Sequence, residues 1–189
     1  MLRHLLYASP LYQLMLKGRT PDRLRLTPPS LLLGDPEAGR RVINGTFTLS
    51  HHQIELGEEP WSTSLNDPDQ LADLHSFSWL ADLYAVGSDD ARARAGQLLC
   101  GWVEHNKKWQ ELSWRPDILG ERLSAWLYCF EFVSTEQEKT RSILLDMAMI
   151  QARHLGRSCS HAPKDARFFK AIQGLVFAAI CLPGAEPML

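Results

Sequence analysis

The chain has 189 residues, of which 45% are hydrophobic and 22% are charged. This composition is typical of a globular protein with one core, and it excludes a disordered tail, a collagen-like fibre and a small disulfide-stapled protein. Lys and Arg together number 20 and Asp and Glu number 22, so the formal net charge is -2. A strongly basic nucleic-acid-binding protein is therefore not expected, although this charge is compatible with a local basic patch.

Residues 1–65 contain short elements separated by proline and glycine. The N-terminal apolar residues predict an amphipathic helix that ends at Gly18, with a signal peptide as the alternative. Proline at a first helical position predicts a short helix over residues 35–43. Alternating apolar and polar residues predict a small β-hairpin within residues 45–57, which must lie against another part of the chain because an isolated hairpin is marginally stable.

From residue 66 onward, apolar residues recur at intervals of three and four, which predicts helices. Capping residues, prolines and glycines place five of them, at 67–87, 88–107, 116–133, 135–157 and 163–182. Short connections make consecutive helices antiparallel neighbours. We therefore predict an all-α fold of successive antiparallel hairpins that form a partial α/α toroid, with a closed bundle or a solenoid as alternatives. In this arrangement residues 1–65 pack on an incomplete helical domain formed by residues 66–189.

The four cysteines, Cys100, Cys129, Cys159 and Cys181, form no CxxC motif and no cluster with the spacing of zinc ligands. We expect neither a metal nor a cofactor. Four reduced thiols and the lack of a clear signal-peptide cleavage site favour a cytoplasmic over a periplasmic location. No segment approaches the ~20 apolar residues of a membrane span.

The segment 105–116 joins two predicted helices and interleaves cations with aromatic rings, among them Lys108, Trp109 and Trp114. Cations suit the carboxylates or sulfates of an acidic polysaccharide, and flat rings suit its sugar faces. In the alternative interpretation, the lysines stabilise the end of a helix and the two tryptophans fill the end of a hairpin. The residues alone favour this second interpretation.

Two carboxylates, Asp117 and Glu121, lie four residues apart on one predicted helix. Such a pair can provide the general acid and base of glycoside hydrolysis, but the adjacent Arg122 favours an ion pair. His75 lies on or near an apolar helix face, which favours a core or cleft-edge histidine over a catalytic base. We rank a hydrolase last among the functions considered.

Four motifs in the helical region resemble those of the heparinase II/III-like polysaccharide lyases, in the same order and spacing. They are Leu74–Leu80 (LHSFSWL), Trp114-Arg115-Pro116 with Arg122 and Trp126, Gln151–Leu155 (QARHL) and Ala178–Glu186 (AAICLPGAE). This resemblance covers residues 66–186. It implies an α/α toroid followed by a β-sandwich domain, and cleavage of an acidic, uronate-containing polysaccharide by β-elimination. The binding residues it implies, together with the segment 105–116, are His75, Lys108, Trp109, Trp114 and Arg122.

The chain departs from this family where its catalytic residues are expected. The family's Asn-His pair falls on Ala166 and Arg167, its second Asn falls on Ala171, and its catalytic Tyr and β-domain His lie beyond Leu189. No catalytic residue can be assigned, and we expect this chain alone to be inactive. The leading hypothesis is the helical portion of a lyase that acts with a downstream β-sandwich domain on an acidic polysaccharide. The alternative is a non-catalytic helical scaffold that binds sugar or protein.

Overall fold

The computed structural model describes residues 2–28, 33–135 and 137–188. This part of the chain is mostly helical and contains one small antiparallel sheet, which confirms the predicted all-α class with a small hairpin. No helix within these ranges is long and apolar enough to cross a membrane.

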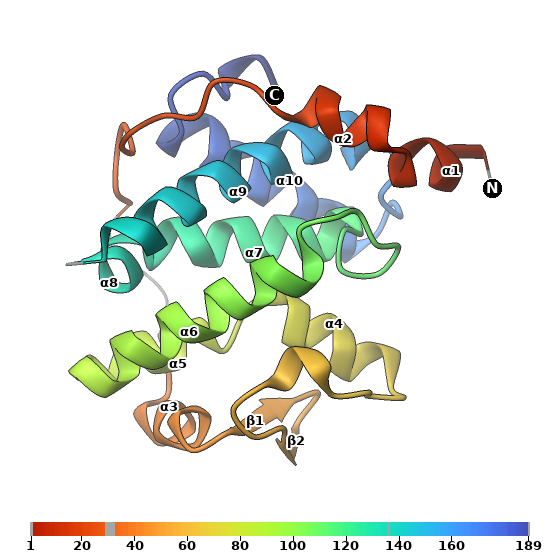
Figure 1. Ribbon diagram of the computed structural model, residues 1–189. Coiled ribbons are helices and arrows are strands. Elements are labelled where there is room, and N and C mark those ends of the chain that lie inside the picture. The colour runs from red at the N-terminus through yellow and green to blue at the C-terminus, as the bar shows by residue number, and fades with distance from the viewer. Residues whose placement is uncertain (1, 29–32, 136, 189) are drawn as a thin grey trace.

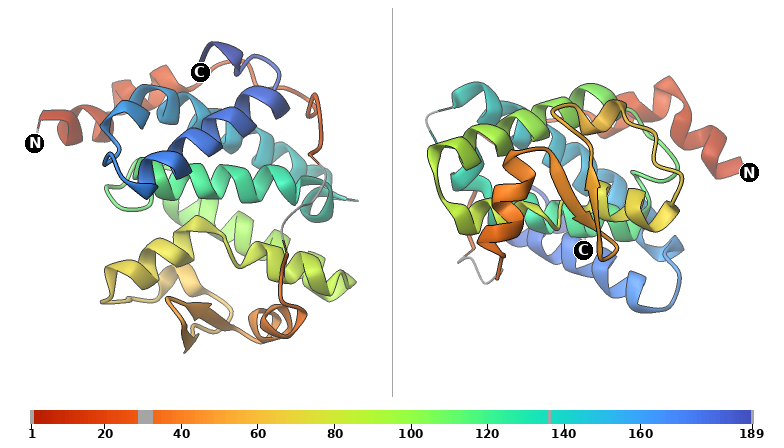
Figure 2. Two further views of the ribbon diagram at one scale, coloured as in Figure 1. Left: turned by 180° about the vertical axis from the view of Figure 1, so that it is seen from behind. Right: turned by 90° about the horizontal axis from the view of Figure 1, so that it is seen from below.

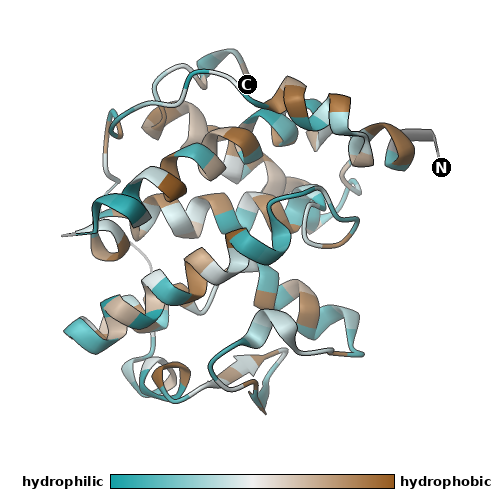
Figure 3. Cartoon of the chain, viewed as in Figure 1, coloured by the Kyte–Doolittle hydropathy of each residue, from teal (hydrophilic) through white to brown (hydrophobic). Residues whose placement is uncertain are grey.

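An N-terminal arm, residues 2–27, begins with two short helices, α1 (Leu2–Ala8) and α2 (Pro10–Leu16). The expectation of one helix here is wrong, because Pro10 has no N–H to continue α1 and Ser9 instead caps α2 by accepting a hydrogen bond from the Tyr12 amide. The rest of the arm is non-helical and runs past α9 (Glu138–Ser158) and α10 (Ala166–Cys181) (Figure 1). Brown segments mark hydrophobic residues on both short helices (Figure 3).

The predicted short helix and hairpin are both present. Helix α3 (Pro36–Ile43) is capped by Asp35, whose carboxylate accepts a hydrogen bond from the Glu37 amide. Strands β1 (Thr46–Leu49) and β2 (His52–Glu55) pair antiparallel, with Phe47 opposite Ile54. The ring of Phe47 is buried edge-on against Trp79, 5.3 Å between centroids, so the hairpin is held by the helical region as its marginal stability requires.

The rest of the helical region comprises α4 (Pro68–Ser76), α5 (Leu80–Val86), α6 (Asp89–Asn106), α7 (Pro116–Tyr128), α8 (Phe130–Ser134), α9 and α10. Single turns of 3-10 helix lie at Pro60–Ser62, Cys159–His161 and Glu186–Met188. Two predicted helices are each interrupted. The first breaks at Phe77, which has a left-handed backbone, and the second breaks at Cys129.

Two predicted helix starts are also wrong. Thr135 was expected to cap the helix that carries residues 138–157, but α9 begins at Glu138 after Gln137, which makes no side-chain capping bond. Pro163 was expected to open the last helix, but α10 begins at Ala166. There the Asp165 carboxylate accepts a hydrogen bond from the Arg167 amide, a stronger start signal than proline alone.

Helix α7 lies at the centre of the molecule, with α9 and α10 on one side and α4 to α6 on the other (Figures 1 and 2). Ten of its thirteen residues are buried. It approaches α10 closely at Gly120 and Gly174, because a Cβ atom added to Gly120 would lie 2.2 Å from the Lys170 carbonyl oxygen. Glycine at these positions therefore allows the two backbones to touch.

Candidate functional site

Arg122 on α7 is fully buried, and its contacts reach three other helices. Its Nε donates to Gln151 Oε1 at 2.8 Å, its Nη1 donates to the His75 carbonyl oxygen at 2.8 Å, and its guanidinium lies 4.1 Å from the centroid of Trp102. Within the described ranges no carboxylate pairs with it. Burial lowers the pKa of Arg122 well below its usual value. The guanidinium thus holds α4, α6 and α9 to the central helix.

His75 takes part in the same cluster. Its Nδ1 accepts a hydrogen bond of 3.0 Å from Trp102 Nε1, so the ring is a neutral acceptor. Burial, and to a smaller extent the nearby Arg122 charge, lower the pKa of His75 to about 3. At neutral pH this histidine therefore joins two helices and carries no charge.

Trp114 is also buried, and one intermediate residue links it to this cluster. Its Nε1 donates to the Asn106 carbonyl oxygen at 2.9 Å, and its ring packs edge-on against His154, 5.3 Å between centroids. His154 lies three residues after Gln151 on α9. Its Nδ1 forms a hydrogen bond of 2.7 Å with the Tyr12 hydroxyl. Asn106 in turn donates from Nδ2 to the Trp102 carbonyl oxygen, so a chain of hydrogen bonds connects Trp114 to the cluster of His75 and Arg122. Ligand binding by these residues stays a prediction.

The two carboxylates near the start of α7 are both paired. Asp117 is buried and receives two hydrogen bonds from Arg115, at 2.7 and 2.8 Å. Glu121 lies 2.7 Å from Lys170 Nζ on α10. An ion pair with Arg122 was the expectation, but that side chain points to the other side of α7 and binds neutral partners. Glu121 thus bridges α7 to α10, whereas Asp117 is paired locally at the start of its own helix.

Lys108 and Trp109, the other two predicted binding residues, lie apart from the Arg122 cluster on the rim of an apolar groove. We use this name for the hollow of about 750 Å³ formed by α2, the end of α6, the following loop and the first half of α9. Its apolar lining consists of Leu14, Val103, Ile143, Met147 and Ile150. Trp109 is half-buried, and its ring lies 5.9 Å from Tyr7 and 5.6 Å from His4 of the arm.

The rim of the apolar groove is positively charged. Lys17, Lys107 and Lys108 line it, and in the described part of the chain no carboxylate pairs with any of them. Asp146 is the one carboxylate among the lining residues, and it accepts a hydrogen bond of 2.8 Å from Thr20 Oγ1. An apolar floor with lysines around it suits a ligand that presents apolar groups flanked by negative charge.

Sequence reasoning missed most of this groove. Ile143, Met147 and Ile150 follow the three-and-four spacing of α9, which does not separate core residues from groove residues: Met147 is buried, whereas Ile143 and Ile150 are only partly buried. The contribution of Leu14, which is 61% exposed, depends on the arm folding back onto α9. Only the lysines and Trp109 gave a signal in the sequence. Among the described residues, no cluster of His, Cys, Asp or Glu could hold a metal ion.

Comparison with known proteins gives one informative relative. The chain is 28% identical over 187 residues to FtsZ-localized protein C of Caulobacter vibrioides, an alignment that covers 97% of this chain and 32% of that protein. The chain thus spans about a third of the length of the curated relative it matches. No known family matches the chain, and no solved structure matches it.

These findings contradict the resemblance to heparinase II/III-like lyases and the β-elimination activity that it implied. The relative is named for localisation to FtsZ, and no lyase family matches. The acidic polysaccharide and the downstream β-sandwich domain consequently have no support. The physical reason is that the motifs describe core packing: Trp79, Trp114, Arg122 and Trp126 are all buried. Buried aromatic residues at helical spacing recur in helical proteins of different function.

Proposed function

We propose that this chain is a non-catalytic helical scaffold that binds a protein partner, and that it localises to FtsZ as its relative is named for doing. The observation that carries this proposal is the apolar groove with its lysine rim. A groove beside a helical surface, with an exposed apolar floor and like charges around it, is a common form of peptide-binding site. The relative supplies the candidate partner.

The pairing of the titratable residues supports a scaffold over an enzyme. His75 is a neutral acceptor for a tryptophan, His154 bonds Tyr12, and Asp117 is held by Arg115. The two histidines join different segments of the chain, Asp117 is paired within the start of α7, and none of the three is among the residues that line the apolar groove. A catalytic acid or base must instead reach the group with which it exchanges a proton.

The same proposal includes the organisation of the chain. Residues 1–65 pack on a helical domain of residues 66–189, whose antiparallel hairpins form part of an α/α toroid. Contacts such as those of Phe47 with Trp79 and of Tyr12 with His154 support the first part of this statement. Helical hairpins of this kind present edges and grooves that bind other chains.

The groove is tested by a pair of matched variants in α2. Leu14 lines the groove and is 61% exposed, whereas Leu11 is 69% exposed and is not among the lining residues. We expect Leu14→Glu to weaken capture of purified FtsZ roughly tenfold, because it places a charge on the apolar floor. Leu11→Glu should leave capture within roughly twofold. In cells, a fluorescent fusion of Leu11→Glu should follow FtsZ, whereas a fusion of Leu14→Glu should not.

A second variant tests the charge of the rim without touching the apolar floor. Lys107→Glu combined with Lys108→Glu reverses two exposed charges and should weaken FtsZ capture most at low salt. Equal capture by the wild-type chain, Leu14→Glu and the lysine double variant would exclude the groove as the binding site. Failure of the wild-type chain to capture or follow FtsZ would exclude FtsZ as the partner.

A further inference from the structure

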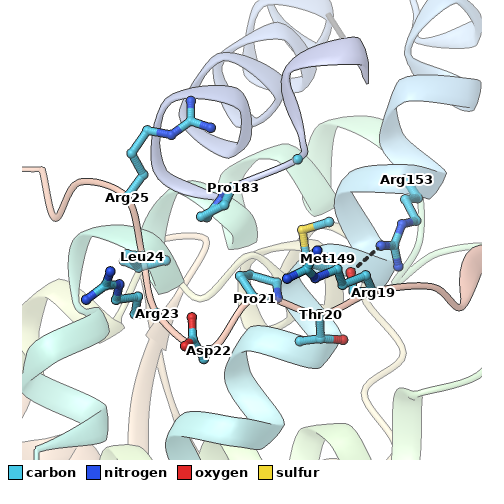
Figure 4. A pocket seen from close by; sticks show the side chains of 11 residues that line it. Arg19, Thr20, Pro21, Asp22, Arg23, Leu24, Arg25, Met149, Arg153 and Pro183 are labelled. Carbon is cyan, nitrogen blue, oxygen red and sulfur yellow. Dashed lines mark hydrogen bonds between the residues drawn. The ribbon is translucent and has the colours of Figure 1, made fainter.

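A second hollow, of about 1010 Å³, lies farther along the N-terminal arm (Figure 4). We call it the arginine hollow because Arg19, Arg23, Arg25 and Arg153 all line it. The rest of its wall is formed by arm residues 20–24, by Met149 of α9 and by the turn at Pro183 and Gly184 after α10. This surface therefore gathers four arginines on a chain whose formal net charge is -2.

The backbone of the arm is fixed at both ends of the arginine hollow. Arg153 donates from Nη1 to the Leu16 carbonyl oxygen at 2.9 Å and from Nη2 to the Arg19 carbonyl oxygen at 2.7 Å (Figure 4). At the other end, the Arg25 amide donates to the Cys181 carbonyl oxygen at 2.8 Å. The arginines are thus mounted on a segment that is already ordered, which lowers the entropic cost of binding.

Most of the positive charge in the arginine hollow is not neutralised within the chain. Arg25 pairs with Glu186, and Asp22 is the one carboxylate among the lining residues. Within the described ranges no carboxylate pairs with Arg19, Arg23 or Arg153. The carbonyl oxygens that hold Arg153 satisfy its hydrogen bonds but carry no charge. The hollow therefore attracts an anion.

The arrangement of the arginines distinguishes an extended anion from a compact one. Figure 4 shows Arg23 and Arg25 at one end, Arg19 and Arg153 at the other, and Pro21 between them. Arg25 is six positions after Arg19, a reach of at most about 20 Å. A single phosphate requires donors that converge on one point, whereas these donors are spread along a line. Leu24, Met149 and Pro183 supply apolar surface between them.

We propose that the arginine hollow binds an extended acidic peptide segment of a protein partner, with carboxylates at both ends paired to arginines and an apolar side chain over Leu24, Met149 and Pro183. Arginine forms bidentate pairs with carboxylates, which gives such a contact geometric specificity as well as charge. This surface is separate from the apolar groove, and the inference does not require the partner to be FtsZ.

The test uses a short fluorescent peptide with glutamates at both ends and leucines at its centre, and a control peptide with glutamine in place of each glutamate. The protein variant is Arg19→Gln combined with Arg23→Gln, since neither side chain makes a contact that the fold requires. Its control is Arg40→Gln combined with Arg92→Gln, two exposed arginines on α3 and α6 with the same change of charge.

At low salt we expect the hollow variant to bind the acidic peptide at least roughly tenfold more weakly than the wild-type chain, and the control variant to bind within roughly twofold. Equal losses in both variants would show general charge attraction and overturn the proposal. Equal binding of the glutamine peptide would overturn it as well. Displacement by inorganic phosphate at matched ionic strength would assign the hollow to a compact anion instead. The peptide contains no part of FtsZ, so this result is independent of FtsZ capture.

Discussion

Arg122 is an uncommon residue because its charge lies in the core without a carboxylate beside it. Removing a guanidinium from water costs several kcal/mol, and here hydrogen bonds to His75 and Gln151 and the face of Trp102 offset that cost. All three partners belong to different helices. Arg122 therefore connects these helices, and its removal leaves the His75 carbonyl oxygen and the Gln151 side-chain oxygen without this hydrogen-bond donor.

We expect Arg122→Ala to lower the free energy of unfolding by about 3 kcal/mol, because it removes two buried hydrogen bonds and opens a cavity. The measurement is urea denaturation followed by circular dichroism. Arg92→Ala on α6 is the control, because Arg92 is partly exposed and its contacts are an ion pair with Asp89 and the ring of Phe132, 5.7 Å from its guanidinium. The ion pair contributes less than about 1 kcal/mol. Similar denaturation midpoints for both variants would contradict this role of Arg122.

Two histidines, the buried His154 and the partly buried His75, predict a dependence of stability on pH. Burial lowers the pKa of His154 from 6.5 to about 4 and that of His75 from 6.5 to about 3. The unfolded chain therefore binds more protons than the folded chain below pH 6.5. Stability should be highest above pH 6.5 and should fall as the pH drops toward 4, with His154 alone contributing on the order of 3 kcal/mol.

This dependence is measured by urea denaturation at a series of pH values. His154→Gln should flatten the curve between pH 6.5 and 4, even if the variant is less stable throughout, because glutamine does not titrate. His52→Gln, on the exposed strand β2, should leave the curve unchanged. A wild-type free energy of unfolding that stays constant across this range would show that the histidines are not held neutral by burial.

At the scale of elements, the contact between α7 and α10 depends on glycine. In Gly120→Ala, the new methyl group would meet the backbone oxygen of Lys170 at 2.2 Å, and a backbone cannot turn away as a side chain can. We expect a loss of about 2 kcal/mol or more in the free energy of unfolding. Gly96→Ala on α6 is the matched control, since its nearest neighbour is the end of the Gln137 side chain at 3.0 Å.

In the Gly96 control, alanine should be neutral or stabilising by up to about 1 kcal/mol, because it favours the helix more than glycine does. Thermal melts of both variants provide the comparison. Equal melting temperatures for Gly120→Ala and Gly96→Ala would mean that α7 and α10 separate without cost. The close packing against the Lys170 backbone supplies the physical reason for glycine at position 120.

The positions of the helices were largely predictable because apolar residues three and four apart mark the buried face of a helix wherever it packs. The interruptions were not. Leu71 to Tyr84 reads as one apolar face, but Phe77 adopts a left-handed backbone, with φ of 60°, and its fully buried ring packs among Trp79, Trp102 and Trp126. Tertiary packing of one aromatic ring thus overrides the local preference for a continuous helix.

At the scale of the whole molecule, the candidate surfaces could not be predicted because each combines segments far apart in the sequence. Leu14 and Ile150 line one groove, and Arg19 and Arg153 line one hollow, with more than a hundred residues between the partners. Trp114 and Trp109 gave the same signal in the sequence, but one is buried against His154 and the other lies at a rim. Only the position of the arm in the folded chain distinguishes the buried tryptophan from the one at the rim of the groove.

The position of the arm has a consequence for how the molecule responds to its ligands. Residues 8–17 form one wall of the apolar groove, and residues 19–25 form one wall of the arginine hollow, so the N-terminal arm contributes to both surfaces. Because the same segment forms a wall of both surfaces, a ligand that shifts its backbone at one surface changes the shape of the other. The two surfaces are then thermodynamically linked, and by reciprocity each occupant changes the binding of the other by the same factor.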